Sequence, residues 1–267
     1  MASIINNISA VNAQRNLANS QGGLNNTINR LSTGLRINRA YDDAAGLQIS
    51  NNLRADVKIL NQARRNANDG LGRLAVVDLV SEEASNLLTR AAELAEQAAS
   101  GTTTTNGRTA LNAELTEISA ALDDLSANTK FDGVAVFGTG STNVQVGETA
   151  GESVNVSQFE ISAASLSITE DLTTSDNALA ALAEITSAIE TVSTERGTIG
   201  AKSQRLLTLT NSLGITSENI QAAESAIRDA DIASEVVNLT KFQILSQSGV
   251  SALAQANQSA QSVLSLL

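Results

Sequence analysis

The chain of 267 residues contains no histidine, cysteine, tryptophan or proline, and aromatic residues make up only 2% of it. Without histidine, the side chain that most often acts as general base and metal ligand near neutral pH is missing. Without cysteine there is no thiolate nucleophile, no disulfide and no thiolate zinc site. Carboxylates alone can hydrolyse glycosides, but ligand sites usually combine aromatic walls with converging polar groups. The composition therefore predicts a protein that is not an enzyme and that needs no cofactor or metal.

The absence of proline favours long uninterrupted helices, because proline breaks helix interiors. Hydrophobic residues make up 42% of the chain, and nearly all of them are alanine, leucine, valine and isoleucine, which fill narrow seams between helices. The net charge of −11 argues against binding to nucleic acid or to an anionic membrane. No stretch approaches the ~20 apolar residues of a transmembrane helix. The first residues also lack the basic and apolar regions of a cleavable secretory signal.

Both ends of the chain carry the pattern of an amphipathic helix, with apolar residues three, four or seven positions apart and amides and hydroxyls on the other faces. Gly22 and Gly23 weaken the first helix by about 1 kcal/mol each relative to alanine. Such helices gain too little alone to be stable, so they are predicted to assemble with partners. The predicted assembly seam consists of Leu17, Leu24, Ile28, Leu31 and Leu35 at one end and of Leu253, Ala256, Ala260, Val263 and Leu267 at the other.

Three further helices are predicted at about 44–99, 106–129 and 177–228. In the last of these, an apolar residue recurs every seven positions, which implies a left-handed supercoil. The members of this stripe are Ile185, Val192, Ile199, Leu206, Leu213, Ile220 and Ile227. Between the helices, residues 131–168 are rich in glycine and alternating valines, and the segment Gly147–Gly151 reads as the turn of a β-hairpin. The predicted fold is mainly α, with long antiparallel coiled-coil-like helices and a small β-hairpin region.

Residues 34–46 and 229–231 interrupt the helical pattern. The first segment is either a spoke between two layers of structure or an ordinary polar loop, and the pattern alone favours neither. The adjacent acidic pairs Asp123-Asp124 and Glu82-Glu83 are interpreted as solvated helix faces, because neighbouring residues on a helix point apart.

Several long motifs, in this order along the chain, resemble bacterial flagellin. They are MASIINNISAVNAQRNL, LSTGLRINRAYDDAAGLQISNNLRADV, QARRNANDGLGRLAVVD, KFDGVAVFG and the closing IRDADIASEV and KFQILSQSGVSALAQANQSAQSVLSLL. The resemblance covers roughly residues 1–168 and 178–267. The chain departs from the family at Ser259, near which proline is frequent, and in lacking a final arginine.

The resemblance implies that the two terminal helices pair into an inner layer around a channel and that 34–46 is the spoke. It implies inner-domain parts at 1–42 and 229–267 and a helical domain at 43–228. Because only residues 169–177 separate the hairpin segment from the long helix, the chain resembles a short form without the variable outer domains. The implied function is polymerisation into the extracellular flagellar filament for motility. The implied partners are other copies of the chain, an export chaperone, the filament cap and hook-junction proteins.

The resemblance also places contacts with Toll-like receptor 5 at Arg90, Leu94 and Glu114, although these residues would equally serve contacts between subunits. Serine and threonine in 139–176 are either O-glycosylated or plain solvent-facing residues. Three other interpretations stay open: a self-contained helical bundle, a flagellar junction protein present in few copies, and an adhesin-like binding module.

Overall fold

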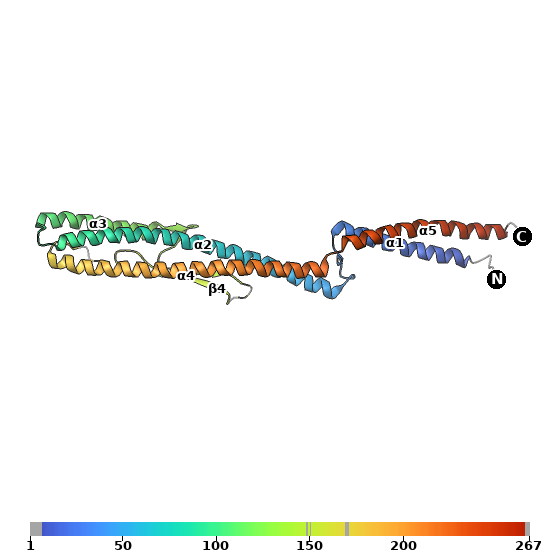
Figure 1. The fold of residues 1–267 in the computed structure, drawn as a ribbon, viewed down its shortest axis with the longest axis horizontal. Coiled ribbons are helices and arrows are strands. Elements are labelled where there is room, and N and C mark those ends of the chain that lie inside the picture. The colour runs from blue at the N-terminus through green and yellow to red at the C-terminus, as the bar shows by residue number, and fades with distance from the viewer. Residues whose placement is uncertain (1–6, 148, 150, 169–170, 265–267) are drawn as a thin grey trace. The chain divides into compact units, whose positions relative to one another are not determined.

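The computed structural model describes residues 7–147, 149, 151–168 and 171–264 (Figure 1). Its helices are α1 (Ile8–Thr33), α2 (Ala44–Ala99), α3 (Thr105–Asn128), α4 (Ser175–Arg228) and α5 (Ile232–Leu264). Its strands are β1 (Lys130–Phe131), β2 (Val134–Ala135), β3 (Ser141–Gln145) and β4 (Ser153–Ser157). The predicted helices at 44–99, 106–129 and 177–228 are confirmed almost to the residue, as is the mainly α fold with a small hairpin. Within the described residues, no helix is both long and apolar enough to cross a bilayer.

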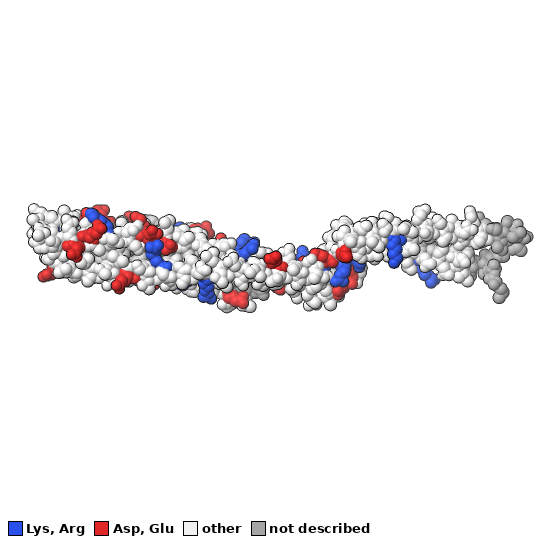
Figure 2. Space-filling view, in the orientation of Figure 1, with Lys and Arg blue, Asp and Glu red and all other residues white. Residues whose placement is uncertain are grey.

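The chain divides into two compact units, which we call the end unit (Met1–Val57 with Asn219–Leu267) and the central unit (Lys58–Glu218). The end unit has seven basic and seven acidic residues, whereas the central unit has ten basic and twenty-one acidic residues. The whole net charge of −11 therefore belongs to the central unit. In Figure 2 charged side chains crowd the helices of the central unit, while α1 and α5 are largely uncharged. The predicted domain boundaries after residues 42 and 228 stay a prediction.

The central unit is built on α2, α3 and α4, which lie side by side in Figure 1. The Ser175 hydroxyl at the start of α4 donates to the Ala99 carbonyl at the end of α2, and Arg196 pairs with Asp78, so α2 and α4 are antiparallel. The seven-residue stripe of α4 supplies core residues up to Leu206. Ile185, Val192, Ile199 and Leu206 are buried, while Leu213, Ile220 and Ile227 are half-buried.

The predicted hairpin is confirmed as the antiparallel pair β3–β4, in which Val144 lies opposite Val154. The four valines at 144, 146, 154 and 156 are all buried against the helices, as their alternation requires. Gly70 of α2 permits this close packing, because a Cβ there would lie 3.0 Å from a methyl of Val144. The second pair, β1–β2, turns through Asp132 and Gly133, both at positive φ, which is the Asp-Gly signature of a tight hairpin.

Candidate functional site

Helices α1 and α5 pack against one another as an antiparallel pair. At one end, α1 stops at Gly34, whose φ of 72° suits glycine, and the Gly34 carbonyl accepts the Ala230 N–H at 2.9 Å. Near the other end, the Asn7 side-chain amide donates to the Ala256 carbonyl at 2.9 Å. The two contacts join residues 196 and 249 positions apart in sequence, so the terminal segments are in register along the pair.

Two glycines make the contact between these helices close. A Cβ on Gly23 would lie 2.5 Å from the Phe242 ring, and one on Gly249 would lie 3.2 Å from the Leu17 side chain. Gly22 has nothing within 4 Å of the same position. Gly23 thus forms the recess that receives Phe242, a role that sequence reasoning missed when it treated both glycines as weak points.

The predicted seam residues fall into three groups. Leu17, Leu24, Leu31, Leu35, Leu253 and Ala256 are half-buried, and Ile28 is 47% exposed. Ala260 and Val263 lie in α5, but their side chains are outside the described part of the chain, as is Leu267 altogether. The role of all ten in assembly stays a prediction.

The pair leaves much of its apolar surface uncovered. Among the described residues of α1 and α5, only Thr27 and Glu235 are buried. The exposed large apolar side chains, 42–67% accessible, are Ile8, Val11, Ile28, Ile232, Val236, Val237, Ile244, Leu245 and Val250. A soluble monomer rarely exposes so much apolar surface unless that surface meets a partner.

The segment that follows α1 is bound to the segment between α4 and α5. The Arg36 N–H donates to the Arg228 carbonyl at 2.7 Å, and Leu35 and Asp229 form an isolated antiparallel bridge. The buried Arg228 returns a hydrogen bond from Nε to the carbonyl of Ile37, itself 1% exposed. Residues 34–37 are therefore ordered by backbone pairing and not a free loop. The spoke role of 34–46 stays a prediction.

Few charges lie in the end unit, and several of them are paired. The Glu235 carboxylate lies 3.1 Å from the Arg30 guanidinium, and Glu224 accepts the Ser50 hydroxyl at 3.0 Å. The pKa of Asp42 lies below its usual range, mainly because its carboxylate accepts the backbone N–H of Arg39. Sequence reasoning missed these pairs, although isolated charges in otherwise uncharged helices were a signal.

The three positions assigned to receptor contacts do not share one surface. Arg90 is exposed and pairs with Glu114 at 2.8 Å and with Glu93 at 3.0 Å, and its pKa is raised chiefly by the hydrogen bond to Glu114. Leu94, by contrast, is 1% exposed and belongs to the core of the central unit. Of the three residues to which the resemblance assigned receptor contacts, Leu94 is therefore not accessible, whereas Arg90 and Glu114 are.

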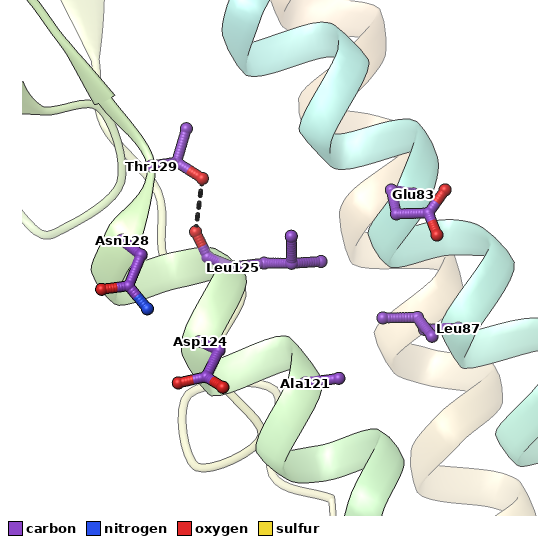
Figure 3. Close-up of a pocket in the computed structure, with 7 residues that line it drawn as sticks. All are labelled: Glu83, Leu87, Ala121, Asp124, Leu125, Asn128 and Thr129. Atoms are coloured by element: carbon purple, nitrogen blue, oxygen red, sulfur yellow. Dashed lines mark hydrogen bonds between the residues drawn. The ribbon is translucent and has the colours of Figure 1, made fainter.

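A groove of about 430 Å³ runs between α2 and α3 (Figure 3). Leu87, Ala121 and Leu125 point into it, whereas the carboxylates of Glu83 and Asp124 point away from each other. Its lining contains no aromatic residue. Nowhere in the described residues do three or more histidine, cysteine, aspartate or glutamate side chains form a group that would hold a metal. The groove thus lacks the converging carboxylates that glycoside hydrolysis needs.

Comparison with known proteins decides the family. The model of the bacterial flagellin N-terminal helical region matches residues 4–142, and that of the C-terminal helical region matches residues 182–267. The chain is 35% identical to the flagellar filament 33 kDa core protein of Treponema phagedenis over 99% of both chains. It is 37% identical to a flagellin of Halalkalibacterium halodurans, again over 99% of both. The chain belongs to the bacterial flagellin family.

As a flagellin family member, the chain is a structural subunit that polymerises into the bacterial flagellar filament for motility. Its relatives are named as flagellins and flagellar filament core proteins, and the family is a structural one. The match over 99% of relatives of similar length fits a short form of the family. Among solved structures, the crystal structure of Bacillus cereus flagellin superposes with a TM-score of 0.51 at 25% identity, covering 56% of this chain and 88% of that one. A putative hook-associated protein from Vibrio parahaemolyticus gives 0.60 at 12% identity, covering 70% and 100%, which shows a shared fold alone.

Proposed function

We propose that the α1–α5 pair is the surface through which copies of this chain join into the filament, and that the pair becomes fully ordered only there. The observation that carries the proposal is the uncovered apolar surface of both helices, with nine large side chains 42–67% exposed. The near absence of charge supports it, since Glu235 and Lys241 are the charged residues of α5. An uncharged apolar helix loses little on leaving water and gains most from being surrounded.

The size of this surface suits contact with several neighbours. Fully burying a large apolar side chain is worth about 1.5–3 kcal/mol, so covering the exposed half of nine gives about 10 kcal/mol. That gain is comparable with the cost of associating two molecules, about 4–15 kcal/mol, before the ordering of the helices is counted. Contact with one neighbour would then be marginal, and stable assembly would need several at once.

Removing both ends tests the proposal. A variant lacking residues 1–40 and 230–267 should stay in the supernatant after centrifugation of a seeded reaction, while the full chain forms sedimenting filaments. A more specific test compares two single substitutions, Ile244→Ser on α5 and Leu79→Ser on α2. The two side chains are 66% and 69% exposed. The change on α5 should raise the critical concentration for elongation much more than the change on α2. Filaments from the doubly truncated chain would overturn the proposal, as would equal effects of the two point changes.

We further propose, from the family, that the chain is exported without cleavage, that its C-terminal segment binds an export chaperone, and that the growing filament meets cap and hook-junction proteins. The charge-poor α5 supports a chaperone-binding segment, because its apolar residues need cover before assembly. Loss of chaperone co-purification after deletion of residues 232–267 would test this. A chain that elongates alone from seeds would be a filament subunit and not a junction protein.

We also propose that the chain has no catalytic activity, since its composition lacks the usual catalytic side chains.

A second proposal concerns host recognition. The exposed Arg90–Glu114 pair supports a contact with Toll-like receptor 5. Leu94 would support this contact indirectly, because its buried side chain packs α2 into the core. Monomer should activate a receptor reporter cell, and Arg90→Ala should reduce the signal, with Arg65→Ala as an exposed control on the same helix. If the unmodified monomer gives no signal, the receptor proposal is contradicted, and Arg90 and Glu114 are then assigned to contacts between subunits.

Intact-mass measurement of the native protein would show whether serine and threonine in 139–176 carry glycans.

A further inference from the structure

Arg73 of α2 is a buried arginine without an acidic partner. Its side chain is enclosed, with only 6% of the residue exposed. One guanidinium nitrogen, Nη2, donates to the Ala135 carbonyl at 3.0 Å, but Nε is buried and has no hydrogen-bond partner among the described residues. No ion pair of 4.0 Å or less joins Arg73 to a carboxylate in the described part of the chain.

The guanidinium lines a hollow of about 370 Å³ between α2 and the strands. Around it lie the amides of Asn66 and Asn143 and the apolar side chain of Val134, which is 56% exposed. Asn66 is fixed, because its amide donates to the Gln145 carbonyl at 3.1 Å. Two acids, Asp69 and Asp132, also line the hollow, yet both are exposed and neither pairs with Arg73.

A buried charge without a partner lowers the stability of the free subunit. Burying an ion costs several kcal/mol unless hydrogen bonds and an opposite charge offset it, and an apolar side chain in its place is often neutral or stabilising. In the free subunit the hydrogen bond from Nη2 to the Ala135 carbonyl offsets only part of this cost. A partner that brings a carboxylate into the hollow would supply the missing opposite charge, through a strong charge-assisted hydrogen bond to the guanidinium.

We infer that Arg73 receives a carboxylate side chain from a second copy of the chain in the filament. The chain assembles with itself, and its central unit carries twenty-one acidic residues against ten basic ones, so an acid is the group that a neighbouring copy can most readily offer. An enclosed arginine with an exposed apolar residue beside it and polar groups at the rim is the arrangement found at interface hot spots. The inference rests on self-assembly of the chain but not on which helices drive it.

Arg73→Leu separates this role from a purely structural one. In the free subunit the change should raise the melting temperature by a few degrees, because an unpaired buried charge is removed. In elongation from wild-type seeds it should slow growth by about tenfold or more, as expected for the loss of one buried charge-assisted contact. Arg73→Lys keeps the charge but not the fork of donors. Its melting temperature and its elongation rate should therefore lie between those of the wild type and those of Arg73→Leu. Asp132→Asn should leave stability unchanged and speed growth, since it removes a rim charge that repels the incoming acid.

Arg65→Gln serves as the matched control, because Arg65 is exposed on the same helix and, among the residues that the structure describes, hydrogen-bonds to the Gln62 side chain alone. It should change neither quantity. If Arg73→Leu elongates at the wild-type rate, or if it lowers stability and elongation together, the inference is overturned. A filament map in which no carboxylate of a neighbouring copy lies within about 4 Å of the guanidinium would also overturn it. Wild-type chain that fails to elongate from seeds would instead contradict the filament function itself.

Discussion

The α1–α5 pair and the central unit are built from the same kinds of residue but use them differently. Among the described residues, every buried hydrophobic side chain except Ile37 belongs to the central unit. Eleven of the seventeen exposed large hydrophobic side chains belong to the end unit. The charges divide the other way, because the central unit holds the whole net charge and the end unit is neutral.

The two regions therefore differ in whether one chain alone can bury their apolar side chains. The central unit closes its core within one chain, since three helices and a hairpin surround the side chains between Leu60 and Leu206. In the α1–α5 pair each helix covers one face of the other. The apolar side chains on the remaining faces of α1 and α5 are therefore exposed. The same apolar, alanine- and leucine-rich composition therefore gives a self-sufficient fold in one region and an incomplete one in the other.

The largest expected effect separates the two regions directly. Leu88→Ala, at a fully buried site of α2, should lower the free energy of unfolding of the free subunit by about 2–5 kcal/mol because it leaves a cavity. Leu24→Ala, at a half-buried site of α1, should change that free energy very little while raising the critical concentration for assembly. Urea denaturation and seeded elongation measure the two quantities. Equal losses of subunit stability would show that α1 is as well folded in the free subunit as α2.

A smaller effect sharpens the account of the α1–α5 contact. Gly22→Ala should stabilise filaments against heat, because alanine favours a helix over glycine by about 1 kcal/mol and no described atom of the same chain obstructs the methyl group. Gly23→Ala should destabilise them, because the methyl meets the Phe242 ring and overpacking costs about 1–3 kcal/mol. Thermal disassembly followed by light scattering checks both. If Gly23→Ala is harmless, Phe242 does not sit in the recess in the filament, whereas rescue by adding Phe242→Leu would confirm the contact.

A more modest effect on filament stability is expected at Glu235, the more buried member of the ion pair with Arg30. Glu235→Gln should lower filament stability by about 1 kcal/mol, since a partly exposed Arg30 can turn to solvent when it loses its partner. A double-mutant cycle with Arg30→Gln isolates the interaction between the two side chains. A coupling of zero would show that the pair contributes only to the shape of the contact.

The smallest effect is a pH dependence at Asp42. Because hydrogen bonds hold its pKa below the ordinary value of 3.8, the stabilisation is present above that value and is lost as the pH falls through the folded-state pKa. A carbon-13 NMR titration of the Asp42 carboxyl should therefore show a midpoint below 3.8. Asp42→Asn should remove this contribution and leave assembly intact. A midpoint at or above 3.8 would show that the Asn38 and Arg39 N–H groups do not bind the carboxylate in solution.

Sequence periodicity predicted the helices well, because a seven-residue stripe such as Ile185 to Leu206 has one physical solution, a helix with a buried seam. The valine alternation and the Gly147–Gly151 turn predicted the hairpin for the same reason. Periodicity could not show what lies opposite a residue. Gly23 was therefore taken as a weakness although it faces Phe242, and Arg73 gave no signal at all. The family resemblance assigned a receptor contact to Leu94, although that side chain is buried.

Hydrogen exchange of the free subunit and of the filament tests the central claim most directly. The account predicts that backbone amides of α1 and α5 exchange rapidly in the free subunit and become protected in the filament, while amides of α3 and of the parts of α2 and α4 in the central unit are protected in both states. Strong protection of α1 and α5 in the free subunit, equal to that of the central unit, would contradict it, because the pair would then be stable without neighbours.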